Sequence, residues 1–118
     1  FKKAVFDGAF IEKTSFVKTK LDKANFSNAN VDRVIFDKAK MTGANFAGAK
    51  FTKATFKNAK MKKVKMNADT RMWYCDFRGA DLSKAKLKKV QFKECVYNSK
   101  TKFPSGFKKK KDGWIKTR

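Results

Sequence analysis

The stretch that decides the fold is residues 24–61, ANFSNANVDRVIFDKAKMTGANFAGAKFTKATFKNAKM, in which a large apolar residue occurs at every fifth position. A small or β-branched residue stands two places before each of them, as Ala24 does before Phe26 and Val34 before Phe36. A period of five matches neither the 3.6 residues of an α-helical turn nor the alternation of a β-strand. The chain must therefore turn once every five residues.

The same period continues on both sides of this stretch. It is unbroken from Phe1 to Met66, and after one additional residue within Asn67–Arg71 it resumes at Met72 and runs on to Tyr97. Two inward positions in every five predict a square coil with four sides, and successive coils should stack through parallel backbone ladders. We therefore expect an all-β fold of about five coils, in which residues 20 apart lie above one another.

Units such as Ala24-Asn25-Phe26-Ser27-Asn28 resemble the A-(D/N)-(L/F)-X-X units of the pentapeptide-repeat family. The resemblance covers roughly residues 1–99 and implies a solenoid, the right-handed quadrilateral parallel β-helix, that serves as a scaffold in several unrelated roles. The tail from Tyr97 to Phe107 also resembles the C-terminal closing segment of many such proteins, which Gly113-Trp114-Ile115 would complete. We expect a solenoid over 1–99 with a one-residue insertion near 67–71, then a C-terminal cap and basic tail over 100–118 that includes the run Lys108–Lys111.

The charge is strongly positive, because 31 Lys and Arg stand against 10 Asp and Glu and give a formal net charge of +21. A nucleic acid, an anionic membrane surface or an acidic protein would relieve the repulsion between these groups. The alternative is a solvated surface in a lysine-rich composition, which the small number of arginines favours slightly. The side of the coil around Met41 is the most basic, and its candidate polyanion-binding residues are Lys20, Lys23, Lys40, Lys60, Lys62, Lys63 and Lys84.

A second side is flat and nearly uncharged, and a protein partner or a second copy of this chain, as a homodimer, could pack on it. Trp73 and Tyr74 are expected to point outward and could act as a hot spot for a partner. In the alternative interpretation, Asn and Gly suit the corners of each coil and the two aromatic side chains fold over a neighbouring side. The candidate partner face comprises Asn25, Asn45, Ala47, Gly48, Trp73 and Tyr74.

Cys75 and Cys95 both occupy the small inward position and are 20 residues apart, so they should stack in adjacent coils. Their Cα atoms would then lie within the range that a disulfide accepts. A bond would indicate an exported compartment such as a periplasm or thylakoid lumen, whereas two buried free thiols fit the cytoplasm. Two cysteines in a chain without histidine cannot form an ordinary zinc site.

Nothing in the sequence indicates an enzyme or a cofactor, because it has no histidine, no nucleophile beside a base and no glycine-rich phosphate loop. No apolar run is long enough to span a membrane. The first residue is Phe1 rather than Met, as expected of a processed chain or an excised domain.

Some members of the family that the chain resembles imitate DNA and bind type II topoisomerases through acidic surfaces, which confers quinolone resistance. A charge of +21 has the wrong sign for a DNA mimic. We expect a non-enzymatic scaffold that binds a macromolecular partner through a flat solenoid face. The alternative is a polyanion-binding module that uses the lysine columns.

Overall fold

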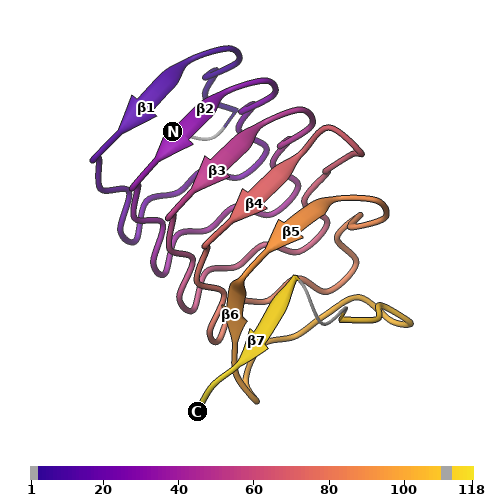
Figure 1. Cartoon of the computed structure of the whole chain (residues 1–118). Helices are drawn as coiled ribbons and strands as arrows, with labels where there is room; N and C mark the ends of the chain where they lie inside the picture. The colour runs from indigo at the N-terminus through magenta and orange to yellow at the C-terminus, as the bar shows by residue number, and fades with distance from the viewer. Residues whose placement is uncertain (1–2, 110–112) are drawn as a thin grey trace.

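The computed structural model describes residues 3–109 and 113–118, none of which is helical. Phe1 and the Lys110–Lys111 part of the basic run lie outside the described residues. Five short parallel strands stack in chain order on one side of the molecule (Figure 1). They are β1 (Phe10–Glu12), β2 (Asn30–Asp32), β3 (Lys50–Thr52), β4 (Arg71–Trp73) and β5 (Gln91–Lys93). A second, two-stranded parallel sheet pairs β6 (Cys95–Tyr97) with β7 (Trp114–Lys116) at the C-terminal end.

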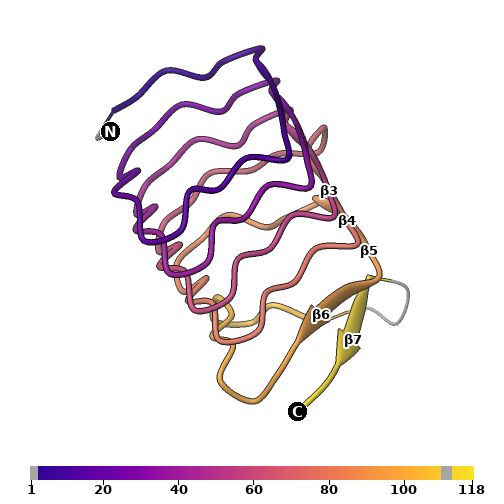
Figure 2. The ribbon, with the colours of Figure 1, turned by 90° about the vertical axis from the view of Figure 1, so that its left-hand side faces the viewer.

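Ladders of isolated parallel bridges form the other three sides of each coil. Figure 2 shows the resulting stack of coils, with β6 and β7 next to each other at its lower end. The fold is therefore the all-β parallel solenoid of about five turns that the period of five predicts. The three ladders run through Ser15, Ile35, Thr55, Asp76 and Val96; through Lys20, Lys40, Lys60, Asp81 and Lys102; and through Val5, Asn25, Asn45, Lys65 and Lys86.

The corners between the sides require left-handed backbone, and lysine supplies more of these positions than any other residue type. A left-handed φ is usual for glycine and is unfavourable for a residue with a Cβ atom. Backbone hydrogen bonds between coils hold these residues in place, as where Lys23 N–H donates to Thr42 O at 2.9 Å. The lysines with φ between 50° and 64° are Lys3, Lys13, Lys18, Lys23, Lys38, Lys53, Lys63, Lys84 and Lys89.

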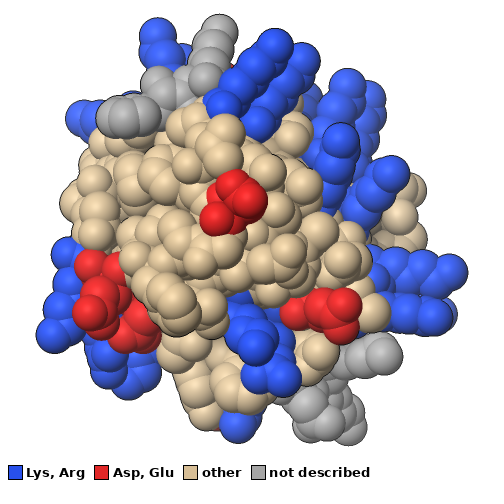
Figure 3. All heavy atoms as spheres, turned by 90° about the horizontal axis from the view of Figure 1, so that it is seen from above, with Lys and Arg blue, Asp and Glu red and all other residues tan. Residues whose placement is uncertain are grey.

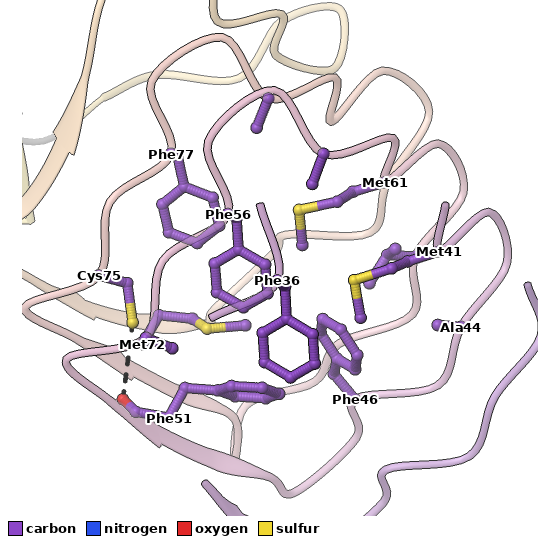
Figure 4. Close-up of a cluster of buried hydrophobic side chains, with 14 of the residues drawn as sticks. Phe36, Met41, Ala44, Phe46, Phe51, Phe56, Met61, Met72, Cys75 and Phe77 are labelled. Atoms are coloured by element: carbon purple, nitrogen blue, oxygen red, sulfur yellow. Dashed lines mark hydrogen bonds between the residues drawn. The ribbon is translucent and has the colours of Figure 1, made fainter. Parts of the chain in front are cut away.

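Stacked phenyl rings fill the interior (Figure 4). Phe56 lies between Phe36 and Phe77, with ring centroids 5.0 Å from each and interplanar angles of 4° and 5°. Phe46 instead tilts against Phe51, with 4.7 Å between the centroids. All five side chains are fully buried. Burial of such rings, with a further 0.5 to 1.5 kcal/mol or so for each aromatic pair, opposes the repulsion of the charged exterior.

The stack absorbs one additional residue where the register changes from 20 (Asn45 with Lys65) to 21 (Lys50 with Arg71). Thr70 fills the small inward position there, and its buried Oγ1 donates to Phe46 O at 2.9 Å. Asn67 Oδ1 accepts the N–H groups of Gly48 and Asp69, each at 3.0 Å. At a regular corner the acceptor is a backbone carbonyl, as where Asn28 N–H donates to Ala47 O. The asparagine side chain thus replaces a backbone acceptor that the longer turn displaces.

A second insertion of the same kind follows, because Asp76 pairs with Val96 at an interval of 20 but Asp81 pairs with Lys102 at 21. Asn98 Oδ1 accepts Gly79 N–H at 3.0 Å, and Thr101 Oγ1 donates to Phe77 O at 2.9 Å. Both turns have the sequence Asn-X-X-Thr. The ladder therefore continues to Lys102, beyond the expected solenoid end at residue 99.

Replacing Thr70 with valine should lower the free energy of unfolding by about 1 to 3 kcal/mol, because the change keeps the shape but leaves the buried Phe46 carbonyl without its side-chain donor. Urea denaturation followed by circular dichroism measures the change. Thr19→Val is the matched control, since Thr19 also occupies a small position but its Oγ1 makes only a 3.4 Å contact with Val17 O. Equal losses for the two variants would show that the hydroxyl bond at Thr70 contributes nothing specific.

Candidate functional site

The seven lysines predicted to bind a polyanion share one side of the solenoid and are all exposed. This side, which we call the lysine face, follows the ladder Lys20, Lys40, Lys60 and lies across the coil from the β1 to β5 sheet. Lys62 belongs to the adjacent outward column. Lys23, Lys63 and Lys84 occupy successive left-handed corners, interrupted only by Gly43.

The ladder positions put like charges in direct register. Lys20 pairs with Lys40 and Lys40 with Lys60, and Leu21 N–H and Met41 N–H each donate at 2.7 Å to a lysine carbonyl of the next coil. Neighbouring parallel segments lie about 4.8 Å apart. Two unit charges at that separation repel by about 1 kcal/mol even in water. The backbone therefore fixes where each lysine side chain begins. The flexible side chains can separate their charges only in part, so some repulsion remains.

The ladder continues through Asp81 to Lys102. Lys102 was not among the predicted lysines because the second insertion shifts its register, and the repeated Asn-X-X-Thr spacing is the signal that could have revealed it. Partial burial would raise the pKa of Asp81. Hydrogen bonds from the Ser83 hydroxyl and N–H, together with the charges of Lys102 and Lys62, outweigh burial and lower it. Asp81 is thus a fixed anion at the lower end of the lysine face.

The other acid on this side, Asp22, is only partly exposed and accepts Thr42 N–H at 3.1 Å. Two carboxylates therefore oppose seven predicted lysines and Lys102. Seen from the N-terminal end, basic side chains extend around the periphery, while acidic groups appear only as small separate patches (Figure 3). The lysine face keeps a strong net positive charge that is accessible to a large anion.

The candidate partner face does not come together as one surface. Asn25, Asn45, Ala47 and Gly48 lie on the side of the Val5 to Lys86 ladder. Their polar groups serve the turns: Asn25 Oδ1 accepts Ser27 N–H and Asn45 Oδ1 accepts Ala47 N–H, both at 2.9 Å. Gly48 has φ of 70°, and a Cβ atom there would meet Asn28 Oδ1. These contacts favour the interpretation that Asn and Gly serve the corners, and they also leave the surface flat.

Trp73 and Tyr74 lie on a different side, at β4 and the corner after it. Lys93 Nζ lies 5.2 Å from the Trp73 ring centroid and 5.5 Å from that of Tyr74. Arg71 Cζ is also 5.2 Å from the Trp73 centroid. The two aromatic side chains therefore form a cation–π cluster with their own neighbours, and only about 42% of Tyr74 is exposed.

Cys75 and Cys95 lie in successive coils, and of the two alternatives that the sequence left open, a disulfide or two buried thiols, the structure has both thiols free and buried. Each Sγ instead donates to a backbone carbonyl, Cys75 to Phe51 O at 3.8 Å (Figure 4) and Cys95 to Met72 O at 2.9 Å. Burial, together with the neighbouring Cys95 thiol, raises the pKa of Cys75 well above its ordinary value. The pair behaves as two small core residues that the backbone satisfies.

Both thiols should react at least 100-fold more slowly with an aromatic disulfide reagent at about pH 8 than after unfolding, because burial blocks access to each thiol and also raises the pKa of Cys75. A spectrophotometric assay in buffer and in 6 M guanidinium, roughly the concentration that unfolds hyperstable domains, measures this. Two thiols should appear in denaturant. Rapid reaction of the native protein would contradict the buried arrangement.

The described part of the chain holds no group of three side chains suited to a metal ion. It likewise contains no helix long and apolar enough to cross a membrane. What the surface does offer is a lysine face, a flat side of turn residues and a cation–π cluster.

Comparison with known proteins gives a consistent result. A family model described as "Pentapeptide repeat region" matches residues 1–66, and one described as "Pentapeptide repeats (8 copies)" matches residues 68–96. A search of curated proteins found no match.

Among solved structures, the pentapeptide-repeat protein Rfr23 from the cyanobacterium Cyanothece 51142 is similar, at 16% identity over 86% of this chain and 88% of that one, with a TM-score of 0.58. A protein from Nostoc Pcc 7120 matches at 17% identity, 98% and 86% coverage and a TM-score of 0.36. A thylakoid-lumen protein from Arabidopsis thaliana matches at 24% identity, 74% and 67% coverage and a TM-score of 0.38.

Family models together cover most of the chain, and the structure has the five-residue period that their descriptions name. Proteins of this kind are typically non-catalytic repeat scaffolds. The chain belongs to the pentapeptide-repeat family.

Proposed function

We propose that this protein is a non-enzymatic scaffold that binds a polyanion, a nucleic acid or an anionic membrane surface, through its lysine face. The observation that carries the proposal is the unbroken ladder Lys20, Lys40, Lys60, whose backbone pairing holds the lysines in register. Lys62 and the corner lysines Lys23 and Lys63 widen this ladder on one side.

Binding of a polyanion would replace the repulsion between the lysines by attraction to the bound negative charges. Lysines in register repel each other in the free protein, and a line of phosphates would neutralise them together. A nucleic acid would also release condensed counterions, so affinity should fall steeply with salt. Because the rigid backbone already holds the charges in place, binding requires no ordering of the chain, and the entropic cost of binding is lower.

A titration of the whole chain against duplex DNA, RNA and anionic liposomes, at about 50 mM and about 200 mM salt, tests the proposal. Fluorescence anisotropy of labelled nucleic acid and co-sedimentation with vesicles are suitable readouts. We expect binding at low salt that weakens strongly at high salt. No binding to any of the three at low salt would remove the proposal, and the arm that binds identifies the class of polyanion.

A second candidate function is binding of a macromolecular partner, or of another copy of the chain, through the flat side. Asn25 and Asn45 favour it, because their side-chain oxygens are used within the turns, and residues 25–28 and 45–48 of this side carry no charged side chain. A negative result in the polyanion titration would leave this candidate as the better explanation. Ala47→Arg, in the middle of the flat side, should then abolish association while leaving the lysine face intact.

Counting the free thiols of the two cysteines tests in which compartment the protein resides. Protein prepared from its native source without reductant should show two thiols in denaturant if it resides in the cytoplasm. No free thiol would favour an exported location such as a periplasm or thylakoid lumen.

A further inference from the structure

The C-terminal end of the solenoid contains a cleft that the lysine face does not use. After Lys102 the chain leaves the ladders and returns beside β6 as β7 (Figure 1). β5 is the last strand of its sheet, and Lys86 is the last residue of its ladder among the described residues. The returning segment covers the end of the core only in part, and a cleft of about 830 Å³ lies between it and the last coil.

Apolar side chains form most of the wall of this cleft. Leu87, Val90 and Phe92 come from the last coil, while Phe107 and Trp114 come from the returning segment. Phe92 and Trp114 pack with ring centroids 4.7 Å apart, and Phe107 packs edge-on against Phe92. A volume of this size is within the range of about 300 to 1,000 Å³ that small-molecule sites occupy.

Close packing of the backbone holds the returning segment in place. Gly113 O accepts Cys95 N–H at 2.8 Å, and a Cβ atom on Gly113 would lie 3.0 Å from Phe92 Cβ and 3.2 Å from Phe92 O. Only glycine allows this approach without a shift of the neighbouring atoms. The wall formed by Phe92 and Trp114 is therefore a defined part of the fold.

The polar groups of the cleft are cationic or hydrogen-bond donors. Among the described residues that line it are four lysines and no carboxylate; the lysines are Lys86, Lys88, Lys89 and Lys108, all exposed. Trp114 is 7% exposed, and its buried Nε1–H has no hydrogen-bond partner within the described chain. Buried donors nearly always have a hydrogen-bond partner, so we expect a bound group to supply an acceptor for this indole N–H. Apolar walls, a lysine rim and an unpaired donor together favour an amphiphile with one anionic end.

We propose that this cleft binds a free long-chain carboxylate, whose hydrocarbon chain lies against Leu87, Phe92 and Phe107 and whose carboxylate meets the lysine rim and the Trp114 N–H. The proposal concerns a different end of the molecule from the polyanion site and does not depend on it. An acidic peptide that added a strand below β5 would hydrogen-bond to backbone groups, whereas this cleft is lined mainly by apolar side chains. A vesicle surface would not enter it.

Calorimetric titration of the whole chain with saturated fatty acids of increasing length, each below its micelle concentration, tests the proposal. Burial of a methylene group strengthens binding by about fourfold at most. We expect Kd to tighten about threefold per added methylene until the chain fills the cleft. The matching methyl ester should bind about tenfold more weakly, because it lacks the charge that the rim attracts.

Two variants and a matched control separate the cleft from general attraction to a cationic protein. Trp114→Phe keeps the aromatic wall and removes only the N–H, so it should weaken carboxylate binding about tenfold while changing the ester less. Lys88→Gln with Lys89→Gln, both exposed, should weaken the acid alone. The control, Lys20→Gln with Lys40→Gln on the lysine face, should leave both ligands unchanged.

The proposal is overturned if Kd does not depend on chain length, if the ester binds as well as the acid, or if the control weakens binding as much as the rim variant. Binding to vesicles or to an acidic peptide without binding to the free acid would also overturn it. None of these outcomes bears on the nucleic-acid titration, so the two proposals fail separately.

Discussion

Replacing Phe56 with alanine is expected to lower the free energy of unfolding by about 3 to 5 kcal/mol. The ring lies between those of Phe36 and Phe77 at 5.0 Å on both sides, so the change removes two stacking contacts and leaves a cavity that rigid coils cannot close. Each coil contacts only its neighbours, and the loss should therefore also reduce cooperativity along the stack. Urea denaturation followed by circular dichroism measures the free energy, and amide hydrogen exchange locates the loss.

Ile35→Ala is the matched control, because Ile35 precedes Phe36 and pairs with Thr55, the neighbour of Phe56, but lies on the outer surface, where it is 40% exposed. It should change stability by less than about 1 kcal/mol. If Phe56→Ala does not fold, Phe56→Leu should still fold and lose about 1 kcal/mol. A loss for Phe56→Ala no larger than for Ile35→Ala would show that the phenyl column does not carry the stability of the solenoid.

Neutralising Lys20, Lys40 and Lys60 together with glutamine should weaken nucleic-acid binding by about two orders of magnitude near 0.1 M salt, if nucleic acid is the bound class. The slope of log affinity against log salt should fall by about 0.9 for each lysine that contacts a phosphate, or about 2.7 in total. The same change removes repulsion in the ladder, so the melting temperature should stay constant or rise. Anisotropy titrations over a salt series and a thermal melt measure both effects.

Lys13→Gln, Lys50→Gln and Lys53→Gln form the control, since these exposed lysines are on the side of the β1 to β5 sheet, across the coil from the lysine face. They change the net charge equally and should reduce the slope by less than about 1. Equal effects from the two triple variants would mean that total charge, and not the ladder, governs binding.

Much of the fold followed from the spacing of large and small apolar residues. Phe36, Phe56 and Phe77 were predicted to stack from their intervals of 20 and 21, and they do. The lysine positions of the basic side followed from the same arithmetic, because a parallel stack converts sequence separation directly into spatial neighbourhood. Cys75 and Cys95 were correctly placed in adjacent coils, but the sequence left open whether they are bonded, since spacing fixes only Cα positions. Each thiol is satisfied by a backbone carbonyl of the preceding coil.

The sequence by itself determined the coil, its period, its core and the sign of its surface charge, because these depend on which residues must avoid water and on the period at which they recur. Only the tertiary structure decided how the stack ends and how its surfaces divide. Asn98 and Thr101 extend the ladder to Lys102 through bonds to residues about 20 positions earlier. The cleft beside Trp114 likewise depends on contacts between coils and on the path of the returning segment, which no local pattern of residues encodes.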